Sequence, residues 1–262
     1  MLKKRLIPKL QMVTTDMAGQ ERLILVTTRL FNEVIPVGDP VSQAKIYESQ
    51  AADELIFIDI RPDIKHKPLM LQLLRKLTAE IFMPITIGGG ITSTDDIRLF
   101  LSHGADKVTI NSEAVRNPSL LTVAGKKFGA QCIVVSIDYR YAANGIPEVY
   151  INGGTTGTSL HPMEWALECE RLGAGEILLT CIDRDGMSQG LDVDLSAKLS
   201  VKLNIPLIVG GGCGIASHFI DGFLIGKADA ITAGTYFCFR DQNPIQTRSH
   251  INNAGIPIRL HQ

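Results

Sequence analysis

The sequence predicts an α/β fold, a single (β/α)8 or TIM barrel that spans residues 1–262 and is built from two half-barrel repeats. Short apolar runs alternate with segments of helical period, as in parallel strands joined by crossover helices. The second half of the chain also repeats the first, with half-barrels at about 1–125 and 126–262. A length of 262 residues suits one such domain.

Each expected strand is a short run rich in β-branched and other apolar residues. In chain order the runs are Arg5–Met12, Asp53–Ile60, Pro84–Ile87, Ala105–Ile110, Gln131–Ile137, Gly175–Thr180, Pro206–Val209 and Ala228–Thr232. Between them we expect helices at Pro40–Ala52, Pro68–Ile81, Thr94–Ser102, Pro118–Phe128, Pro162–Leu172 and Ile215–Ile225. Four of these helices begin with proline, which the first helical turn tolerates because an N–H there has no partner within the helix.

The internal repeat supports the closed barrel more strongly than the strand count does. Residues 53–57 align with 175–179, residues 84–90 with 206–212, and residues 104–109 with 227–232, each at an offset of about 122. Chance similarity among apolar strands rarely gives three ordered matches at one spacing. Four strands repeated once make the eight that close a barrel.

Composition and charge exclude several classes of partner. The formal net charge of −1 creates no field that would draw the chain to nucleic acid or to a membrane. The basic N-terminal stretch contains no apolar run long enough for a signal peptide or a spanning helix. Five cysteines without CxxC spacing are interpreted as buried free thiols in a reducing compartment. We therefore expect a cytoplasmic protein.

Two triglycine turns point to phosphate binding at the mouth of the barrel. Glycine lets backbone N–H groups approach an anion, and a helix N-terminus adds a favourable dipole. Glycines also serve tight turns, but here each triglycine is followed one strand later by a pair of small residues that can complete a phosphate shell. The predicted phosphate-binding residues are Gly88, Gly89, Gly90, Asn111 and Ser112 in one half, and Gly211, Gly212, Gly234 and Thr235 in the other. The substrate should then carry a phosphate at each end.

Acidic residues near the ends of strands are the candidates for chemistry. Asp138 closes the fifth strand and would point into the mouth, where a carboxylate can act as a general acid or base or merely cap a loop. Opposite two phosphate sites, chemistry is the favoured interpretation. Asp183 and Asp185 are expected to shape their loop, so that Gly186 also meets the phosphate. With Asp59 and Thr180, these two aspartates make up the predicted substrate-positioning set.

The six histidines are scattered and show no metal-ligand spacing. No metal site and no cofactor is expected.

With these residues in view, the sequence closely resembles the cyclase subunit of imidazole glycerol phosphate synthase. The likeness covers nearly the whole chain, and its most specific stretches are Gly88–Ile91, Gly104–Asn111 and Gly173–Gly186. In that family, ammonia from a glutaminase subunit enters the bottom of the barrel, travels through its core and reacts with a bisphosphorylated ribulosyl substrate at the top. The resemblance therefore implies an ammonia channel, a glutaminase partner in a heterodimer and a phosphorylated small-molecule substrate.

The family's ammonia gate is a ring of charges, and its positions match Arg5, Glu54, Lys107 and Glu176. All four lie near the starts of expected strands, so their side chains can meet around one axis. Buried charges are costly unless they are paired, so the resemblance implies mutual salt bridges. Asp106 matches a family position at the glutaminase contact.

The chain departs from the family at the catalytic end. The family's acid–base pair has an aspartate at the end of the first strand, where this chain has Gln11, while the second aspartate is retained as Asp138. A carboxamide cannot carry a proton near pH 7, and loss of a general acid–base group typically costs ~10²–10⁴-fold in rate. The loop that follows, Val13–Val37, is longer than usual. In it the family's substrate-gripping lysine is replaced by Thr27, and Arg29 is a candidate for the phosphate contact.

Three functions follow from these observations. The first is a divergent paralogue that adds ammonia to a nucleotide sugar in surface-polysaccharide synthesis, where similar cyclase-like proteins occur beside glutaminase-like partners. The single diphosphate of a nucleotide sugar, however, suits two separate phosphate sites less well. The second is the ordinary lyase of histidine biosynthesis, with Gln11 compensated by Asp59 or Asp183. The third is a non-catalytic scaffold that activates the glutaminase, although a scaffold needs neither Asp138 nor glycine turns.

Overall fold

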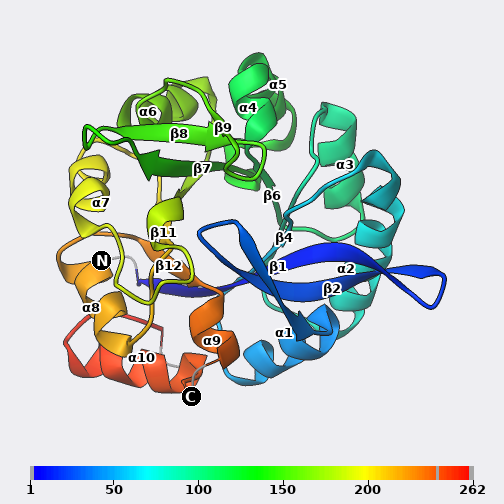
Figure 1. Ribbon diagram of the computed structural model, residues 1–262, viewed down its shortest axis with the longest axis horizontal. Helices are drawn as coiled ribbons and strands as arrows, with labels where there is room; N and C mark the ends of the chain where they lie inside the picture. The colour runs from blue at the N-terminus through cyan, green and yellow to red at the C-terminus, as the bar shows by residue number, and fades with distance from the viewer. Residues whose placement is uncertain (1–2, 240–241, 260–262) are drawn as a thin grey trace.

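A computed structural model of the protein describes residues 3–239 and 242–259. Eight parallel strands close into a barrel, as the sequence predicts (Figure 1). Around the barrel they are β1 (Arg5–Met17), β4 (Leu55–Asp59), β5 (Ile85–Gly88), β6 (Lys107–Ile110), β7 (Ile133–Tyr141), β10 (Glu176–Cys181), β11 (Leu207–Gly210) and β12 (Ala230–Ala233). Closure comes from parallel pairing of β12 with β1 and of β10 with β7. The boundary between half-barrels stays a prediction.

Helices surround the barrel on its outside (Figure 1). They are α1 (Pro40–Ser49), α2 (Lys67–Glu80), α3 (Thr94–Ser102), α5 (Ser119–Phe128), α6 (Pro162–Leu172), α7 (Val193–Ser200), α8 (Ala216–Leu224) and α10 (Pro244–Asn253). Short helices α4 (Ser112–Arg116) and α9 (Thr235–Phe239) follow β6 and β12. All six predicted helices are confirmed within a few residues, whereas α7 and α10 were missed. No helix among the described residues is long and apolar enough to cross a membrane.

The predicted loop Val13–Val37 is wrong, because this segment forms an antiparallel hairpin. Strand β1 runs on to Met17, turns, and returns as β2 (Gln20–Arg29), which pairs in turn with β3 (Glu33–Gly38). The turn is made by Ala18 and Gly19, both with left-handed backbone (φ 55° and 80°), as two-residue hairpins require. A second hairpin joins β7 to β8 (Pro147–Ile151) and β9 (Thr156–Gly157).

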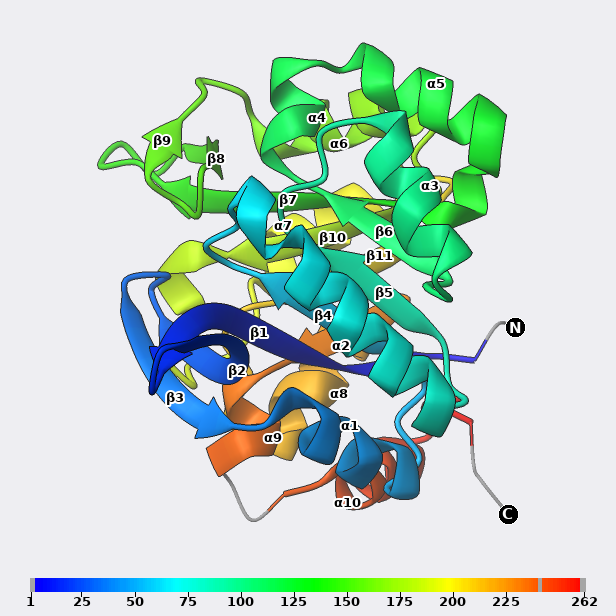
Figure 2. The ribbon, with the colours of Figure 1, turned by 90° about the vertical axis from the view of Figure 1, so that its right-hand side faces the viewer.

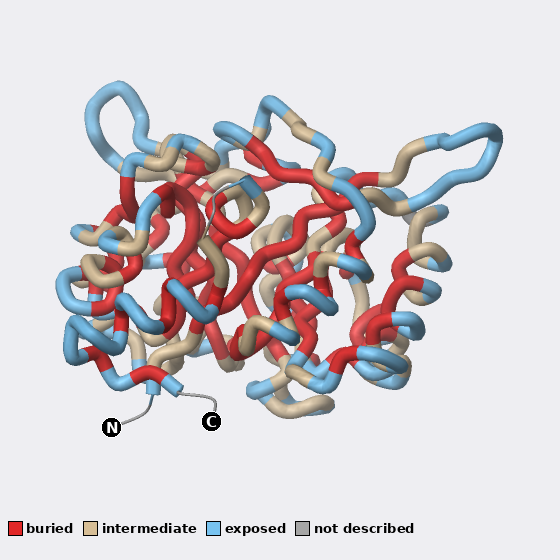
Figure 3. The backbone as a smooth tube through the Cα atoms, turned by 90° about the horizontal axis from the view of Figure 1, so that it is seen from below, coloured by how far each residue is buried: buried red, intermediate tan, exposed pale blue. Residues whose placement is uncertain are grey.

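Both hairpins extend from the C-terminal ends of the barrel strands. The chain termini lie at the opposite end, where Lys4 pairs with Ile258 (Figure 2). Seen from the side, exposed loops project at one end and the termini lie at the other, with buried strands between them (Figure 3). The mouth is therefore the end that carries the hairpins.

Alternation along the strands stacks the inward-facing side chains in layers. The bottom layer is charged. Above it lies an apolar layer of Ile7, Ile56, Val134, Leu178, Ile208 and Ala230. Buried hydroxyls lie among and beyond these residues. In the sheet register Thr86 pairs with Ile56, Thr109 with Val134 and Thr232 with Ile7, whereas Ser136 and Thr180 follow Val134 and Leu178 on the inward faces of β7 and β10. Polar and charged side chains then line the mouth.

The five cysteines are free. Cys169, Cys181 and Cys213 are buried, as expected. Cys132 and Cys238 are only partly buried, so the prediction of buried thiols is wrong for these two. Both lie at edges of the barrel's outer shell, in the turn before β7 and in α9.

Candidate functional site

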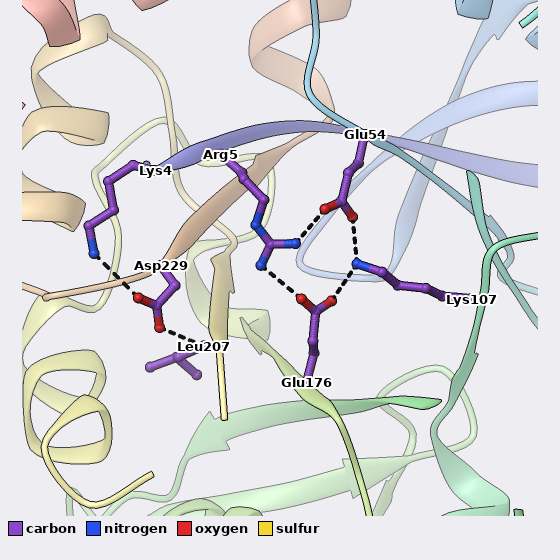
Figure 4. A network of polar contacts seen from close by, with 7 residues as sticks. All are labelled: Lys4, Arg5, Glu54, Lys107, Glu176, Leu207 and Asp229. Carbon is purple, nitrogen blue, oxygen red and sulfur yellow. Dashed lines mark hydrogen bonds and ion pairs between the residues drawn. The ribbon is translucent and has the colours of Figure 1, made fainter. Parts of the chain in front are cut away.

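At the bottom of the barrel, Arg5, Glu54, Lys107 and Glu176 form a closed ring of ion pairs, here called the gate ring after its predicted role (Figure 4). Arg5 bonds Glu54 through Nη1, and its Nη2 lies 2.9 Å from Glu176 Oε1. Lys107 Nζ lies 3.0 Å from Glu54 Oε2 and 2.9 Å from Glu176 Oε2. Burial alone would lower the pKa of Arg5, but the carboxylates of Glu54 and Glu176 raise it above its ordinary value. Each member of the ring thus has two partners of opposite charge.

Asp106 lies beside the gate ring, at the start of β6, and is exposed. Its Oδ2 accepts a hydrogen bond from the Ile85 backbone N–H at 2.8 Å. Asp229 has the same position before β12: it accepts from Leu207 N at 3.1 Å and pairs with Lys4 (Figure 4). The exposed carboxylate of Asp106 is available to a partner, but its role there stays a prediction.

At the mouth, the larger of two cavities has a volume of about 850 Å³. Gly89, Gly90, Asn111 and Ser112 line it, as do the predicted chemical and positioning residues Gln11, Asp59, Asp138 and Thr180. Its rim comes from the β4 loop (Arg61, Pro62, Asp63), the turn between β2 and β3 (Phe31, Asn32) and the second hairpin. This volume is in the range of small-molecule sites.

The second cavity has a volume of only about 20 Å³. It is lined by Asp185, Gly186, Gly211, Gly212, Gly234 and Thr235, which are the predicted residues of the other half, and also by Lys9 and Gln11. Because Lys9 and Gln11 line both cavities, the two hollows adjoin beside the middle of β1. The structure thus brings both triglycine turns to one mouth, with very unequal space beside them.

Two glycines show why no side chain can stand in these turns. Gly89 has φ +103°, and a Cβ there would lie 2.5 Å from the backbone oxygen of Asp59 on the neighbouring strand. Gly211 has φ +85°, and a Cβ would lie 2.6 Å from the backbone oxygen of Cys181. Each turn packs tightly against the end of an adjacent strand, so glycine is required for packing as well as for access to a ligand.

Asp138 lies at the mouth, where burial raises the pKa of its carboxyl to about 6. The charge of Lys9 opposes this shift, and that of Asp185 adds to it. Asn111 Nδ2 donates to Asp138 Oδ2 at 2.8 Å and also to the backbone oxygen of Ser136 at 3.1 Å, which fixes the carboxylate. A carboxyl that titrates near neutral pH beside a cavity is suited to general acid–base chemistry.

Gln11 is held by the first hairpin. Its Nε2 lies 3.1 Å from Thr28 Oγ1, and the Thr28 hydroxyl donates in turn to Asp185 Oδ2. Burial raises the pKa of Asp185. The hairpin therefore ties Gln11 and Asp185 together across the mouth, in an arrangement that uses the amide as a hydrogen-bonding group and not as a proton carrier.

Several residues named from the sequence lie outside both cavities. Gly88 is the last residue of β5, and a Cβ added to it would lie only 2.2 Å from Thr109 Cγ2. Asp183 accepts from Tyr141 N at 2.8 Å and pairs with Arg140, which makes it part of the second hairpin's support. Thr27 is buried with its hydroxyl unpartnered, and Arg29 pairs with Glu33 on the outside of the hairpin.

Sequence reasoning missed many of the residues that line the larger cavity, among them Thr28, Phe31, Arg116 and Lys9. Thr28 and Phe31 reach it because the predicted loop is a hairpin, and Arg116 reaches it from α4. Lys9 is only 7% exposed and points inward from β1. Its position could have been found by alternation, because Arg5, Ile7, Lys9 and Gln11 share one face of the strand.

Within residues 3–239 and 242–259, no cluster of three or more His, Cys, Asp or Glu side chains could hold a metal ion.

Comparison with known proteins matches residues 15–242 to the model of a family described as "Histidine biosynthesis protein". A protein of Prochlorococcus marinus (strain MIT 9313), named "Putative imidazole glycerol phosphate synthase subunit hisF2", is 48% identical over 262 residues, which is 100% of both chains.

Proposed function

Since this chain belongs to the histidine biosynthesis protein family, we propose that it is a cyclase-type synthase subunit that receives ammonia from a glutaminase partner and adds it to a phosphorylated substrate. One observation carries the proposal: a paired ring of charges closes one end of the barrel, and two glycine-walled cavities open at the other. An apolar layer separates them.

The layers favour neutral ammonia as the species that moves. An ammonium ion would lose its hydration beside Ile7 and Leu178, where neighbours such as Thr232 offer neutral hydroxyls but no opposite charge, which is costly. Ammonia carries no charge and passes such a layer at much lower cost. At least one ion pair of the gate ring must break to admit ammonia, and we propose that it breaks when the glutaminase binds at this end.

The unequal cavities support a large acceptor with its phosphates at one end. A diphosphate with a nucleoside attached fits about 850 Å³ beside Gly89 and Gly90, whereas about 20 Å³ beside Gly211 and Gly212 suits one small anionic group. Gln11 removes one half of the family's acid–base pair, which points away from the ordinary cyclisation. We therefore propose a nucleotide sugar as the acceptor, in surface-polysaccharide synthesis.

The experiment supplies ammonium chloride at pH 8 to the purified chain, in one series with the ribulosyl bisphosphate substrate of imidazole glycerol phosphate synthase and in another with UDP-N-acetylhexosamines. Mass spectrometry follows the gain of nitrogen. Turnover only in the second series is expected. Normal turnover with the ribulosyl substrate would reject the nucleotide sugar and establish the histidine-pathway reaction. In the variant Gln11→Asp, a gain in cyclase rate would show that the missing acid alone had limited that reaction.

Calorimetry separates an enzyme from a scaffold. We expect UDP and inorganic phosphate to give saturable heats, and Gly89→Ala to abolish them because its Cβ meets the Asp59 backbone. Absence of any phosphate-dependent heat in the wild-type chain would favour a scaffold that only activates the glutaminase.

A further inference from the structure

Lys9 lies where the interior of the barrel meets the mouth. It is the next inward residue of β1 after Ile7, which belongs to the apolar layer, and it precedes Gln11, which lines both cavities. Lys9 lines both cavities as well, and it is 7% exposed. Ammonia that crosses the apolar layer therefore emerges beside this side chain.

The charge of Lys9 acts on two carboxyl groups, buried Asp185 and half-buried Asp138, without forming an ion pair with either. It opposes the rise in the pKa of both Asp138 and Asp185. Among the described residues, however, no carboxylate oxygen lies within 4.0 Å of its Nζ, the limit for a salt bridge. Its Nζ lies over the Phe31 ring, 6.0 Å from the ring centroid. The side chains of Lys9 and Asp138 thus line one cavity without an ion pair between them.

We propose that Lys9 and Asp138 are the proton-transfer pair of this site, with Lys9 in the role that Gln11 cannot fill. The inference rests on the proposed function, because it takes ammonia as the nucleophile. In this arrangement Gln11 and Thr28 hold the hairpin in place, and the chemistry belongs to the two groups that are left without salt bridges.

The step balances without any further reactant. The lone pair of ammonia forms a bond to an electrophilic carbonyl carbon of the acceptor, and the C=O π pair moves onto oxygen. Lys9 Nζ gives that oxygen a proton, and Asp138 takes a proton from the new ammonium nitrogen, which leaves a carbinolamine. Return of the proton from the Asp138 carboxyl to the Lys9 amine resets the pair.

An anion-binding role for Lys9 fits the charges less well. With Asp138 and Asp185 ionised, two negative charges face one positive charge, so the centre does not attract a phosphate. The glycine turns and Arg116 of the larger cavity offer an anion better surroundings. A cation between two carboxyl groups of raised pKa is instead arranged for sharing protons.

The first test needs no acceptor. Carbon-13 NMR of carboxyl-labelled aspartate follows the titration of Asp138, which faces Lys9, Asn111, Thr180 and Asp185. We expect Lys9→Met to raise the pKa of Asp138 and Lys9→Arg to leave it near the wild-type value. The control Lys65→Met removes an exposed lysine that pairs with Glu21 and should change nothing. An unchanged Asp138 titration in Lys9→Met would overturn the proposal.

The second test measures turnover with ammonium chloride and whichever acceptor the wild-type chain uses. Lys9→Met and Lys9→Arg should both lower kcat ~10²–10⁴-fold with little change in KM, because arginine keeps the charge but does not release a proton. Wild-type kcat in Lys9→Arg would show that charge alone is needed and would refute proton transfer. If the wild-type chain uses no acceptor, the proposed function fails, and the titration still decides whether Lys9 and Asp138 are coupled. Thermal unfolding of each variant confirms that it is folded.

Discussion

Replacing Lys107 by methionine tests whether the gate ring is an electrostatic unit. Lys107 Nζ contacts Glu54 and Glu176 at 3.0 and 2.9 Å, and the side chains of these glutamates are only 7% and 9% exposed. In Lys107→Met both carboxylates compete for Arg5 alone, and two negative charges meet in a largely dry space. Removing one partner of a buried pair typically costs about 3–5 kcal/mol, so we expect a loss of unfolding free energy of that size.

Urea unfolding at pH 7, followed by circular dichroism, measures this loss. The matched control is Lys45→Met, which removes an exposed lysine paired with Glu80 on the helical shell. Exposed pairs contribute about 0–1 kcal/mol. A loss for Lys107→Met no greater than that for Lys45→Met would refute the reasoning, because it would mean that the ring's charges do not depend on one another.

A double variant sharpens the test. Lys107→Met combined with Glu54→Gln leaves one arginine and one glutamate, Arg5 with Glu176 at 2.9 Å. Because the charges again balance, the second substitution should recover part of the stability lost in the first, with a coupling of about 0.5–3 kcal/mol. Strict additivity of two losses would contradict the model of a shared ring.

Three further predictions concern other parts of the barrel. The pKa of Asp138 is raised from 3.8 to about 6, so its favourable contribution to stability is complete below about pH 4 and is lost as pH rises through about 6. The unfolding free energy of Asp138→Asn should therefore gain up to ~3 kcal/mol relative to that of the wild type between pH 4 and pH 8. Urea unfolding of both proteins at the two pH values measures this gain. Gly211→Ala should lose ~1–3 kcal/mol because its φ is +85°, and more because the new Cβ would lie 2.6 Å from the Cys181 backbone oxygen. Gly255 also has a positive φ (+76°) but open space around a Cβ, so comparing the thermal unfolding of Gly255→Ala isolates the clash, and equal losses in the two variants would contradict it. Arg248→Met should cost about 3–5 kcal/mol, since it leaves buried Asp53 without the cation that lies 3.0 Å away; a calorimetric melting temperature equal to that of the wild type would exclude the ion pair as a stabilising contact.

The barrel could be predicted because a parallel strand covered on both faces must be apolar along its length. That requirement produces the eight runs and makes them stand out from helical segments such as Thr94–Ser102. The triglycine turns were equally visible, since Gly89 and Gly211 each pack against a neighbouring strand end and tolerate no side chain. Burial of a strand on both faces and close packing of a turn each restrict the residue types at a few adjacent positions, so both can be recognised in the sequence.

The hairpins and the surroundings of Gln11 could not be predicted in the same way. Residues 13–38 pair with one another over the mouth. Their apolar run, Leu23–Val26, was left unassigned because the alternation of strand and helix in a (β/α)8 barrel has no place for an extra strand before the first helix. Thr28 contacts Gln11 and Asp185 only because this hairpin folds back. Lys9 was missed because a lysine in a strand is usually exposed, and only its parity with Arg5 and Gln11 shows that it points inward.

The two ends of the barrel use the same kinds of charged group in opposite ways. In the gate ring each charge has two partners, so removal of one destabilises the chain. At the mouth, buried Lys9 and half-buried Asp138 form no salt bridge with any described residue, and Asp138 costs stability once it ionises. Folding alone does not favour such groups, so their burial beside a cavity is evidence for chemistry there. The argument requires opposite signs: Lys107→Met must destabilise and Asp138→Asn must stabilise at pH 8, and two changes of the same sign would remove the distinction between gate and catalytic site.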